Sequence, residues 1–311
     1  MAQTIETTTA ERTILVAGRE RRYLVTKPSA PNSAAPLVLV LHGSNQTPQI
    51  IRGFTEPSFD TLASSDGAVV VYPEGYKKHW NDARLSTNFA ARTEGFDDVA
   101  FLRAIIDEFV SAGTVDATRV FAVGYSLGGQ MVNRLAHEVP EILAGIAIIS
   151  ATQPAAENFK PDKDTVHPMP VLLIHGTKDP NVPYEGGMAS LLGFRPRGLG
   201  LSAPATAKYW AERNGMHSEG ATVVIAVDGG RGTTVDRTDF AAGGSPLGNA
   251  VHYPRRRPRD PRPQSGPPNN GPHIERNPRG RRDRALLRTS SLTHPDATSM
   301  RSGSRLKRPF T

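Results

Sequence analysis

The chain has 311 residues, enough for one large α/β domain or two small ones with a substantial buried core. It contains no cysteine, which excludes disulfides and thiolate metal sites. The formal net charge is +7, but residues 248–311 hold 15 Lys and Arg against 4 Asp and Glu, which leaves 22 against 26, or −4, for residues 1–247. The charge of the main domain therefore gives no reason to expect a nucleic-acid partner.

The first residues, MAQTIETTTAERT, are polar and lack the apolar stretch of a signal peptide. No run of about 20 apolar residues is present to span a membrane. We therefore expect a cytoplasmic protein without a transmembrane segment. A start codon assigned too far downstream would hide an export signal, so secretion stays open as the alternative.

The first elements predict the start of a sheet. Residues 13–27 read as a hairpin that turns at Ala17 and Gly18. The continuous aliphatic run at residues 37–41 is typical of a strand buried on both faces of a parallel sheet, and residues 67–73 contain a second such strand.

The loop after the first buried strand reads His42, Gly43 and Ser44. An α/β enzyme places its second oxyanion donor in a loop of this kind, and Gly43 allows a close backbone approach. The alternative is a simple strand-to-helix turn with a packed His42.

Two further segments allow two interpretations each. The first either lines a pocket or packs over a loop; it consists of Trp80, Asn81 and Asp82. Asp97 and Asp98 begin an amphipathic helix whose apolar residues recur at spacings of three and four, and capping explains this acidic pair as well as chemistry does.

The segment VFAVGYSLGGQMVNR, at residues 120–134, combines a β-prone run with a helix-compatible one. Between them lies a G-x-S-x-G pattern made by Gly124, Ser126 and Gly128. A serine on a sharp strand-to-helix turn has a strained backbone and needs neighbours without bulk at both positions. Its hydroxyl then points out of the sheet, and the amide of Leu127 at the helix start favours an oxyanion.

The second half continues the alternation of strands and helices. Residues 142–150 and 171–175 predict core strands, residues 203–214 a helix and residues 222–227 a further strand. Asp179 follows the second of these strands, where the chain order Ser, acid, His places an orienting carboxylate. An Asp-Pro turn is the alternative. The alternation predicts a mostly parallel α/β sheet.

Seven ordered segments together resemble the α/β-hydrolases, and within them the polyhydroxybutyrate depolymerase-like esterases, a family that includes feruloyl and acetyl-xylan esterases. The segments are LVLVLHGSNQT from Leu37, VVVYPEG from Val69, WND from Trp80, DDVAFLRAIID from Asp97, VFAVGYSLGGQMVNRLA from Val120, HGTKDPNVPYEGG from His175 and AKYWAERNG from Ala207.

This resemblance implies an α/β-hydrolase fold, with a mostly parallel sheet and helices on both faces. It implies a serine esterase with Ser126 as nucleophile and Asp179 as acid, and with an oxyanion hole made by the backbone amides of Leu127 and Ser44. Trp80 is expected to contact the substrate, a small ester or a polyester oligomer. No metal or cofactor is implied.

The histidine that would complete a catalytic triad with Ser126 and Asp179 is not found in the pattern that the family has. The family pattern ends with a strand that runs into Gly-Gly-Gly-His and Pro-Gly, and this histidine is the general base. The histidines downstream of the expected acid do not stand in such a pattern; they are His217, His252, His273 and His294.

From residue 248 onward the sequence is rich in Pro and Arg and has no periodicity. Such a segment buries too little apolar surface to offset its ordering entropy. We therefore expect an α/β-hydrolase domain at residues 1–247 that lacks its last strand and helix, followed by a disordered basic tail at residues 248–311.

The genetic code suggests how the motif was lost. Proline codons are CCN and arginine codons include CGN, so reading residues 254–263 one nucleotide later permits His-Gly-Gly-Gly-His-Val-Ile-Pro-Gly-Pro. We therefore predict a frameshift near Leu247, genuine or from sequencing. Without its general base, Ser126 is expected to be a very poor nucleophile, since loss of one triad member typically costs about 10⁴-fold or more in kcat.

The sequence allows an alternative from a different class of function. In this alternative, the α/β domain is a non-catalytic scaffold and its basic tail binds nucleic acid or an anionic surface. Clustered arginine favours it, whereas the tail has only Tyr253 and Phe310 as aromatic residues and shows no amphipathic period.

Overall fold

The computed structural model describes residues 5–30, 33–191, 193–218, 220–227, 233–240 and 251–258, with residues 225–227, 233 and 251–258 as main chain alone. The chain divides into a first unit, Met1–Arg262, and a second, Pro263–Thr311. The second unit, and with it most of the expected basic tail, lies outside the described residues.

The strands are β1 (Thr7–Val16), β2 (Arg19–Pro28), β3 (Ala35–Leu41), β4 (Val69–Pro73), β5 (Val115–Tyr125), β6 (Gly145–Ile149), β7 (Val171–Gly176), β8 (Gly187–Leu191), β9 (Phe194–Gly200), β10 (Val223–Val227), β11 (Thr233–Phe240) and β12 (Val251–Pro258). The helices are α1 (Pro48–Phe54), α2 (Asp60–Asp66), α3 (Ala90–Thr93), α4 (Asp98–Ser111), α5 (Leu127–Glu138) and α6 (Ala203–Arg213), with short 3-10 turns at Tyr76–Lys78, Pro140–Ile142 and Ala156–Asn158. None of the described helices is both long and apolar enough to cross a membrane.

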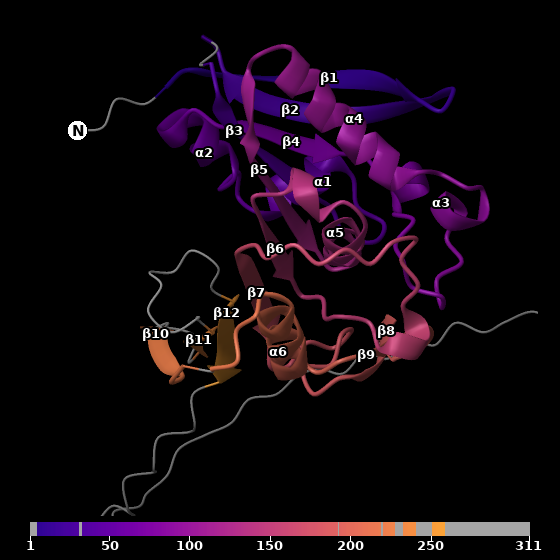
Figure 1. The fold of residues 1–311 in the computed structure, drawn as a ribbon, viewed down its shortest axis with the longest axis vertical. Helices are drawn as coiled ribbons and strands as arrows, with labels where there is room; N and C mark the ends of the chain where they lie inside the picture. The colour runs from indigo at the N-terminus through magenta and orange to yellow at the C-terminus, as the bar shows by residue number, and fades with distance from the viewer. Residues whose placement is uncertain are drawn as a thin grey trace, which may run out of the picture. The chain divides into compact units, whose positions relative to one another are not determined.

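Ten of these strands form one mixed sheet in the order β1-β2-β4-β3-β5-β6-β7-β12-β11-β10, while β8 and β9 pair separately (Figure 1). The run from β4 through β3, β5, β6 and β7 to β12 is parallel. The outer pairs at both edges are antiparallel. Because parallel strands end at the same edge, the loops after β3, β5 and β7 gather there.

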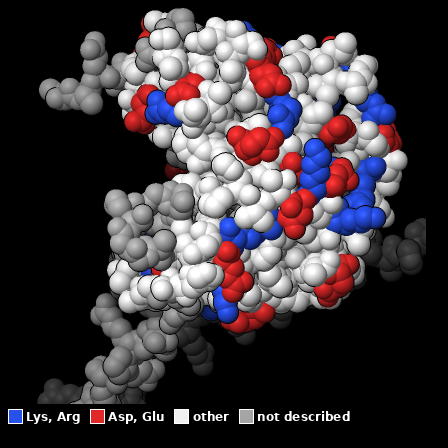
Figure 2. Space-filling model, viewed as in Figure 1, with Lys and Arg blue, Asp and Glu red and all other residues white. Residues whose placement is uncertain are grey.

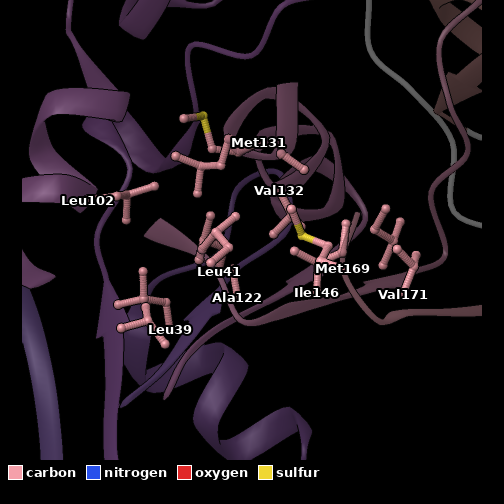
Figure 3. Packing of buried hydrophobic residues seen from close by; sticks show 14 of the residues in the cluster. Leu39, Leu41, Leu102, Ala122, Met131, Val132, Ile146, Met169 and Val171 are labelled. Carbon is pink, nitrogen blue, oxygen red and sulfur yellow. The ribbon is translucent and has the colours of Figure 1, made fainter. Parts of the chain in front are cut away.

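Helices cover both faces of the sheet, as the alternation of side chains along the buried strands requires. In β3, Leu39 and Leu41 belong to the larger core cluster with residues of α4, α5 and α6, whereas Val38 and Val40 belong to a smaller cluster with residues of α1 and α2. Figure 3 shows Leu39 and Leu41 of β3 together with Met131 of α5 among the labelled side chains of the larger cluster.

The N-terminal hairpin confirms the turn expected from the sequence. Ala17 has φ 49° and Gly18 has φ 75°, so both central residues are left-handed, which is the geometry of a tight hairpin turn. The strands are longer than expected, because pairing extends over ten residues of each.

The acidic pair before α4 has a structural role. Asp97 caps the helix by accepting a hydrogen bond from the Ala100 amide at 2.9 Å. Asp98 is fully buried and forms an ion pair with buried Arg21 at 2.5 Å. Removing either partner would leave a buried charge unpaired, which is strongly destabilising.

The sheet does not end where the sequence led us to expect. We expected the last strand to be absent, with the domain ending at residue 247, but the main chain of residues 251–258 forms β12 between β7 and β11. Pairing through backbone groups does not depend on apolar side chains, and the exposed edge of β7 offers unpaired N–H and C=O groups. The Pro- and Arg-rich composition was therefore a poor guide to these eight residues.

The surface of the described residues carries both signs of charge. Figure 2 shows basic and acidic side chains interspersed on the visible face. Ion pairs such as Arg103 with Glu141, at 2.7 Å, and Arg12 with Glu108, at 2.8 Å, belong to this mixture. The face seen in Figure 2 therefore has the mixed charge of an ordinary solvated surface.

A buried histidine links two helices. In α5, His137 donates from Nδ1 to the Asn133 carbonyl at 2.6 Å and accepts at Nε2 from the Tyr209 hydroxyl of α6 at 2.6 Å. Burial is the main cause that lowers the pKa of His137 to about 4. The imidazole of His137 is therefore neutral in the folded state down to about pH 4. In the unfolded chain the same side chain gains a proton near the ordinary histidine pKa of about 6.5.

This difference predicts acid sensitivity. The contribution of neutral His137 is present above about pH 6.5 and is lost as the pH falls toward 4, because only the unfolded state gains the proton. Between pH 7 and pH 5 the free energy of unfolding should fall by about 2 kcal/mol less in His137→Gln than in the unaltered protein. Urea titrations at both pH values measure this, with exposed His167→Gln as control. Equal pH dependence in all three proteins would contradict it.

Candidate active site

Ser126 stands between the end of β5 and the start of α5. Its backbone has φ 52° and ψ −113°, a strained conformation for a residue with a side chain. Its amide donates to the Ile149 carbonyl at 2.8 Å, and its carbonyl accepts from the Gln130 amide at 3.2 Å. The turn is thus fixed on both sides, and the half-buried Ser126 lines a cavity.

Both glycines of the motif are required by close contacts. A Cβ on Gly124 would lie 2.3 Å from the Gly128 carbonyl oxygen, and a Cβ on Gly128 would lie 2.2 Å from the Leu41 carbonyl oxygen. The helix start therefore rests directly on the main chain at the ends of β5 and β3. Only glycine permits this approach.

One amide is available in the loop after β3. The Gly43 amide donates to Gln46 Oε1 at 2.8 Å, the Asn45 amide to the Lys78 carbonyl at 3.1 Å, and the Gln46 amide to the Gly43 carbonyl at 3.3 Å. Within the described residues no acceptor is found for the Ser44 amide, and none for that of Leu127 at the N-terminus of α5. Both residues line the cavity with Ser126. The two free N–H groups suit a developing oxyanion.

His42 is a packed residue at the base of this loop. It is fully buried; Nδ1 donates to the Gly43 carbonyl at 2.7 Å and Nε2 accepts from the Gly75 amide at 2.9 Å. Burial lowers the pKa of His42 to about 4, so the ring is neutral at ordinary pH. The packed His42 that we considered as an alternative and the free amide of Ser44 are therefore both present in this loop.

Trp80 does not lie where we expected it. It is fully buried, its indole N–H donates to the His42 carbonyl at 2.9 Å, and its ring packs 4.9 Å from the His42 ring. Trp80 is absent from the described lining of the cavity. It supports the loop that carries Ser44 rather than contacting a substrate, because the core satisfies both its apolar surface and its N–H group.

Asp179 lies just after β7. Its Oδ1 accepts from the amides of Asn181 at 2.8 Å and Val182 at 2.9 Å, which holds the carboxylate in place. Oδ2 lies 3.9 Å from His175 Nε2, which itself donates to the Val182 carbonyl at 2.8 Å. Oδ2 thus remains able to accept a hydrogen bond from a further donor.

Two observations place the Asp179 loop near the Ser126 turn. Asn181 and Val182 line the same cavity as Ser126. Burial and then the negative charge of Asp179 raise the pKa of the Tyr125 phenol, and Tyr125 is the neighbour of Ser126. Because β6 separates β5 from β7, the two strand ends stand about 10 Å apart. An imidazole can bridge a gap of this size between a hydroxyl and a carboxylate.

The cavity itself has a volume of about 220 Å³, below the roughly 300–1,000 Å³ of pockets for drug-sized ligands. The lining comes from the loops after β3, β5 and β7, from α5, from the segment at residues 84–89 and from the hairpin β8–β9; the hairpin contributes Ala189, Ser190, Leu191 and Arg197. We did not predict this hairpin from the sequence.

No histidine belongs to the described lining of the cavity. His175 is buried on β7, two strands away from β5. His217 is exposed, and His252 is described as main chain alone. His273 and His294 lie outside the described residues. Among the described residues there is also no cluster of three His, Asp or Glu that could hold a metal ion.

Comparison with known proteins bears on this geometry. Residues 25–191 match the family model described as Phospholipase/Carboxylesterase. The chain is 35% identical to a putative esterase NocK of Nocardia uniformis subsp. tsuyamanensis, over 58% of this chain and 52% of the relative. It is 30% identical to feruloyl esterase B of Piromyces equi, over 64% and 36%. It is 34% identical to a poly(3-hydroxybutyrate) depolymerase of Ralstonia pickettii, over 41% and 28%.

The fold has a counterpart among solved structures. The crystal structure named sOPH Native has a TM-score of 0.50 and 19% sequence identity, and the match covers 65% of this chain and 75% of that one. This likeness and the observed sheet confirm the expected α/β-hydrolase fold.

The family model covers more than half of the chain, so the protein belongs to the phospholipase/carboxylesterase family. The resemblance to feruloyl esterases and polyhydroxybutyrate depolymerases is likewise confirmed. The chain spans about half or less of the length of these curated relatives.

The close contacts of the motif predict a sharp difference between two glycines. Gly128→Ala should lower the free energy of unfolding by about 2 kcal/mol or more, because its Cβ meets backbone that cannot move away. Gly176→Ala is the control, since no atom lies within 4 Å of its added Cβ, and it should change stability by less than about 0.5 kcal/mol. Denaturant unfolding measures both, and equal stability of the two variants would disprove the contact argument.

Proposed function

We propose that this protein is a serine carboxylic ester hydrolase that works through an acyl-enzyme, and that this chain turns over slowly because it lacks a general base. The observation that carries the proposal is the position of Ser126, held at φ 52° beside two amides without acceptors in the described structure. Membership of the carboxylesterase family supports it.

In this mechanism the Ser126 hydroxyl attacks the ester carbonyl, and the negative charge that forms on the carbonyl oxygen is stabilised by the amides of Leu127 and Ser44. The alcohol leaves with a proton, and an acyl group remains on Ser126. Water then attacks this second ester and releases the acid. Each step needs a group that takes the proton from the nucleophile and returns it to the leaving oxygen.

The end of β12 is where such a group is expected. In the register of β12 with β7, Arg255 lies opposite His175 and Arg256 opposite Gly176. The main chain at Pro258 therefore reaches the same edge of the sheet as the loop with Asp179. In the shifted reading of residues 254–263 a histidine takes the position of Pro258, which supports the frameshift as the cause of the missing base.

The relatives and the cavity support a proposal for the substrate class. Named relatives include feruloyl, acetyl-xylan and poly(3-hydroxybutyrate) esterases, so a small ester or a polyester oligomer is the proposed substrate. The small cavity favours a short acyl group over a long chain.

The first test concerns the nucleophile. A fluorophosphonate probe should label the full-length protein slowly at one site, because the oxyanion amides are formed while the base is missing. Ser126→Ala should abolish labelling, and Ser111→Ala at the exposed end of α4 should not change it. Labelling that survives in Ser126→Ala would overturn the assignment of the nucleophile.

The second test concerns the base. Replacing residues 254–263 by HGGGHVIPGP should raise kcat/KM for p-nitrophenyl acetate by about 10³–10⁴-fold, because the base then completes the triad. The matched control carries HGGGAVIPGP and should remain slow. Ordinary turnover by the unaltered chain, or no gain in a folded HGGGHVIPGP variant, would refute a lost base at this position. The nucleotide sequence of codons 245–263 tests the frameshift directly.

A further inference from the structure

The described lining of the cavity contains two cationic residues and no acidic one. Arg84 and Arg197 are the cationic residues, and the remaining lining residues are neutral. A cavity lined in this way has a positive potential unless its arginines are neutralised from behind. The partners of each arginine therefore decide what charge a bound group meets.

Arg84 is neutralised. Its Nη2 lies 2.8 Å from Asp82 Oδ2 and its Nε 3.2 Å from Asp82 Oδ1, which makes a forked ion pair. Both side chains are buried, so this pair is shielded from solvent. Arg84 also donates to the Arg197 carbonyl at 3.3 Å. Its role is to hold the loop and the neighbouring strand together.

Arg197 forms no ion pair with a described residue, and the nearby carboxylate of Asp82 is already paired with Arg84. The guanidinium of Arg197 instead lies over the ring of Phe89, 4.5 Å from the ring centroid, and Phe89 also lines the cavity. A guanidinium stacked by one face on an aromatic ring keeps its N–H groups free at the edge. These donors match the two oxygens of a carboxylate.

The main chain of Arg197 is fixed in place. Its carbonyl accepts from the Ser86 hydroxyl at 2.7 Å as well as from Arg84. The next residue, Gly198, has φ +89°, and a Cβ there would lie 2.2 Å from Asn158 Nδ2. The backbone at Arg197 is therefore held by two other segments of the chain, residues 84–86 and Asn158. Such pre-organisation lowers the entropy lost when a ligand binds.

The electrostatic surroundings of Arg197 are consistent with an unfilled site. Burial and then the positive charges of Arg84 and Arg195 lower the pKa of the Arg197 guanidinium below its usual value, and Asp82 offsets this in part. An anion bound beside Arg197 would relieve this repulsion.

We propose that Arg197 is a substrate-binding residue that holds a carboxylate on the ester, so that the enzyme prefers esters whose acyl or alcohol part carries a negative charge, such as monoesters of dicarboxylic acids. This inference rests on the proposed esterase function, since it names the substrate class of the same cavity. A hydroxyalkanoate oligomer with a free terminal carboxylate belongs to this class, and a neutral ester does not.

The test measures binding without turnover. Ligand-observed NMR compares monomethyl glutarate, an anionic ester, with dimethyl glutarate, its neutral counterpart, on the full-length protein. The unaltered protein should bind the monoester at least about tenfold more tightly than the diester. Arg197→Gln should remove this preference by weakening the binding of the monoester, without changing the affinity for dimethyl glutarate. Arg197→Lys keeps the positive charge but loses the two parallel N–H donors of the guanidinium, so it should retain part of the preference for the monoester.

The control is Arg195→Gln on the same strand, because Arg195 is exposed and is not part of the cavity lining. It should change the affinity for the monoester by less than about twofold at physiological salt. Equal binding of both esters by the unaltered protein, or an equal loss of both in Arg197→Gln, would overturn the inference.

The two proposals fail in different ways. If the monoester preference depends on Arg197 but the fluorophosphonate probe does not react at Ser126, the anionic subsite stands and the esterase function is wrong. If the probe reacts at Ser126 and both glutarates bind alike, the esterase function stands and the subsite is wrong.

Discussion

The contact on which the site depends is the one between the start of α5 and the end of β3. Gly128 lies so close to the Leu41 carbonyl that no side chain fits between them. This approach brings the helix N-terminus against the sheet and forces Ser126 into a left-handed backbone conformation. The strain is maintained because both sides of the turn are anchored, by the β6 carbonyl at Ile149 and by the first turn of the helix.

The same contact joins the two segments whose amides we propose as the oxyanion donors. Leu41 is the last residue of β3, and the loop that follows it carries the free amide of Ser44. His42 and Trp80 support this loop from the core side. A packed hydrophobic core thus determines the distance between two backbone donors, which is the quantity that electrostatic stabilisation depends on most strongly.

The sequence predicted the parts of the fold that local patterns determine. Continuous aliphatic runs identified β3, β4 and β7, and the glycine spacing identified the turn at Ser126. It was less informative where partners lie far apart along the chain. The indole of Trp80 looked like a substrate contact because nothing in its local sequence shows that the His42 carbonyl accepts from it. Arg197 drew no attention because its importance comes from Phe89 and Ser86, more than 100 residues away.

The strand β12 was missed for a related reason. Its Pro- and Arg-rich sequence lacks the alternation that marks a strand, and its pairing is decided by the open edge of β7. The hairpin β8–β9 is equally inconspicuous, since its short strands are rich in glycine and partly exposed. Both elements depend on the backbone of a partner strand. The residues next to them in the sequence carry no information about that partner.

The described lining of the cavity and the proposed position of the base at the end of β12 lie in separate parts of the chain. Every described residue of the cavity lies at or before Arg197, in a part of the chain translated before β10 begins. A change in the message downstream of this point alters β12 and leaves the earlier codons intact. In the proposed mechanism, one such genetic event removes the base and leaves every described residue of the cavity unchanged.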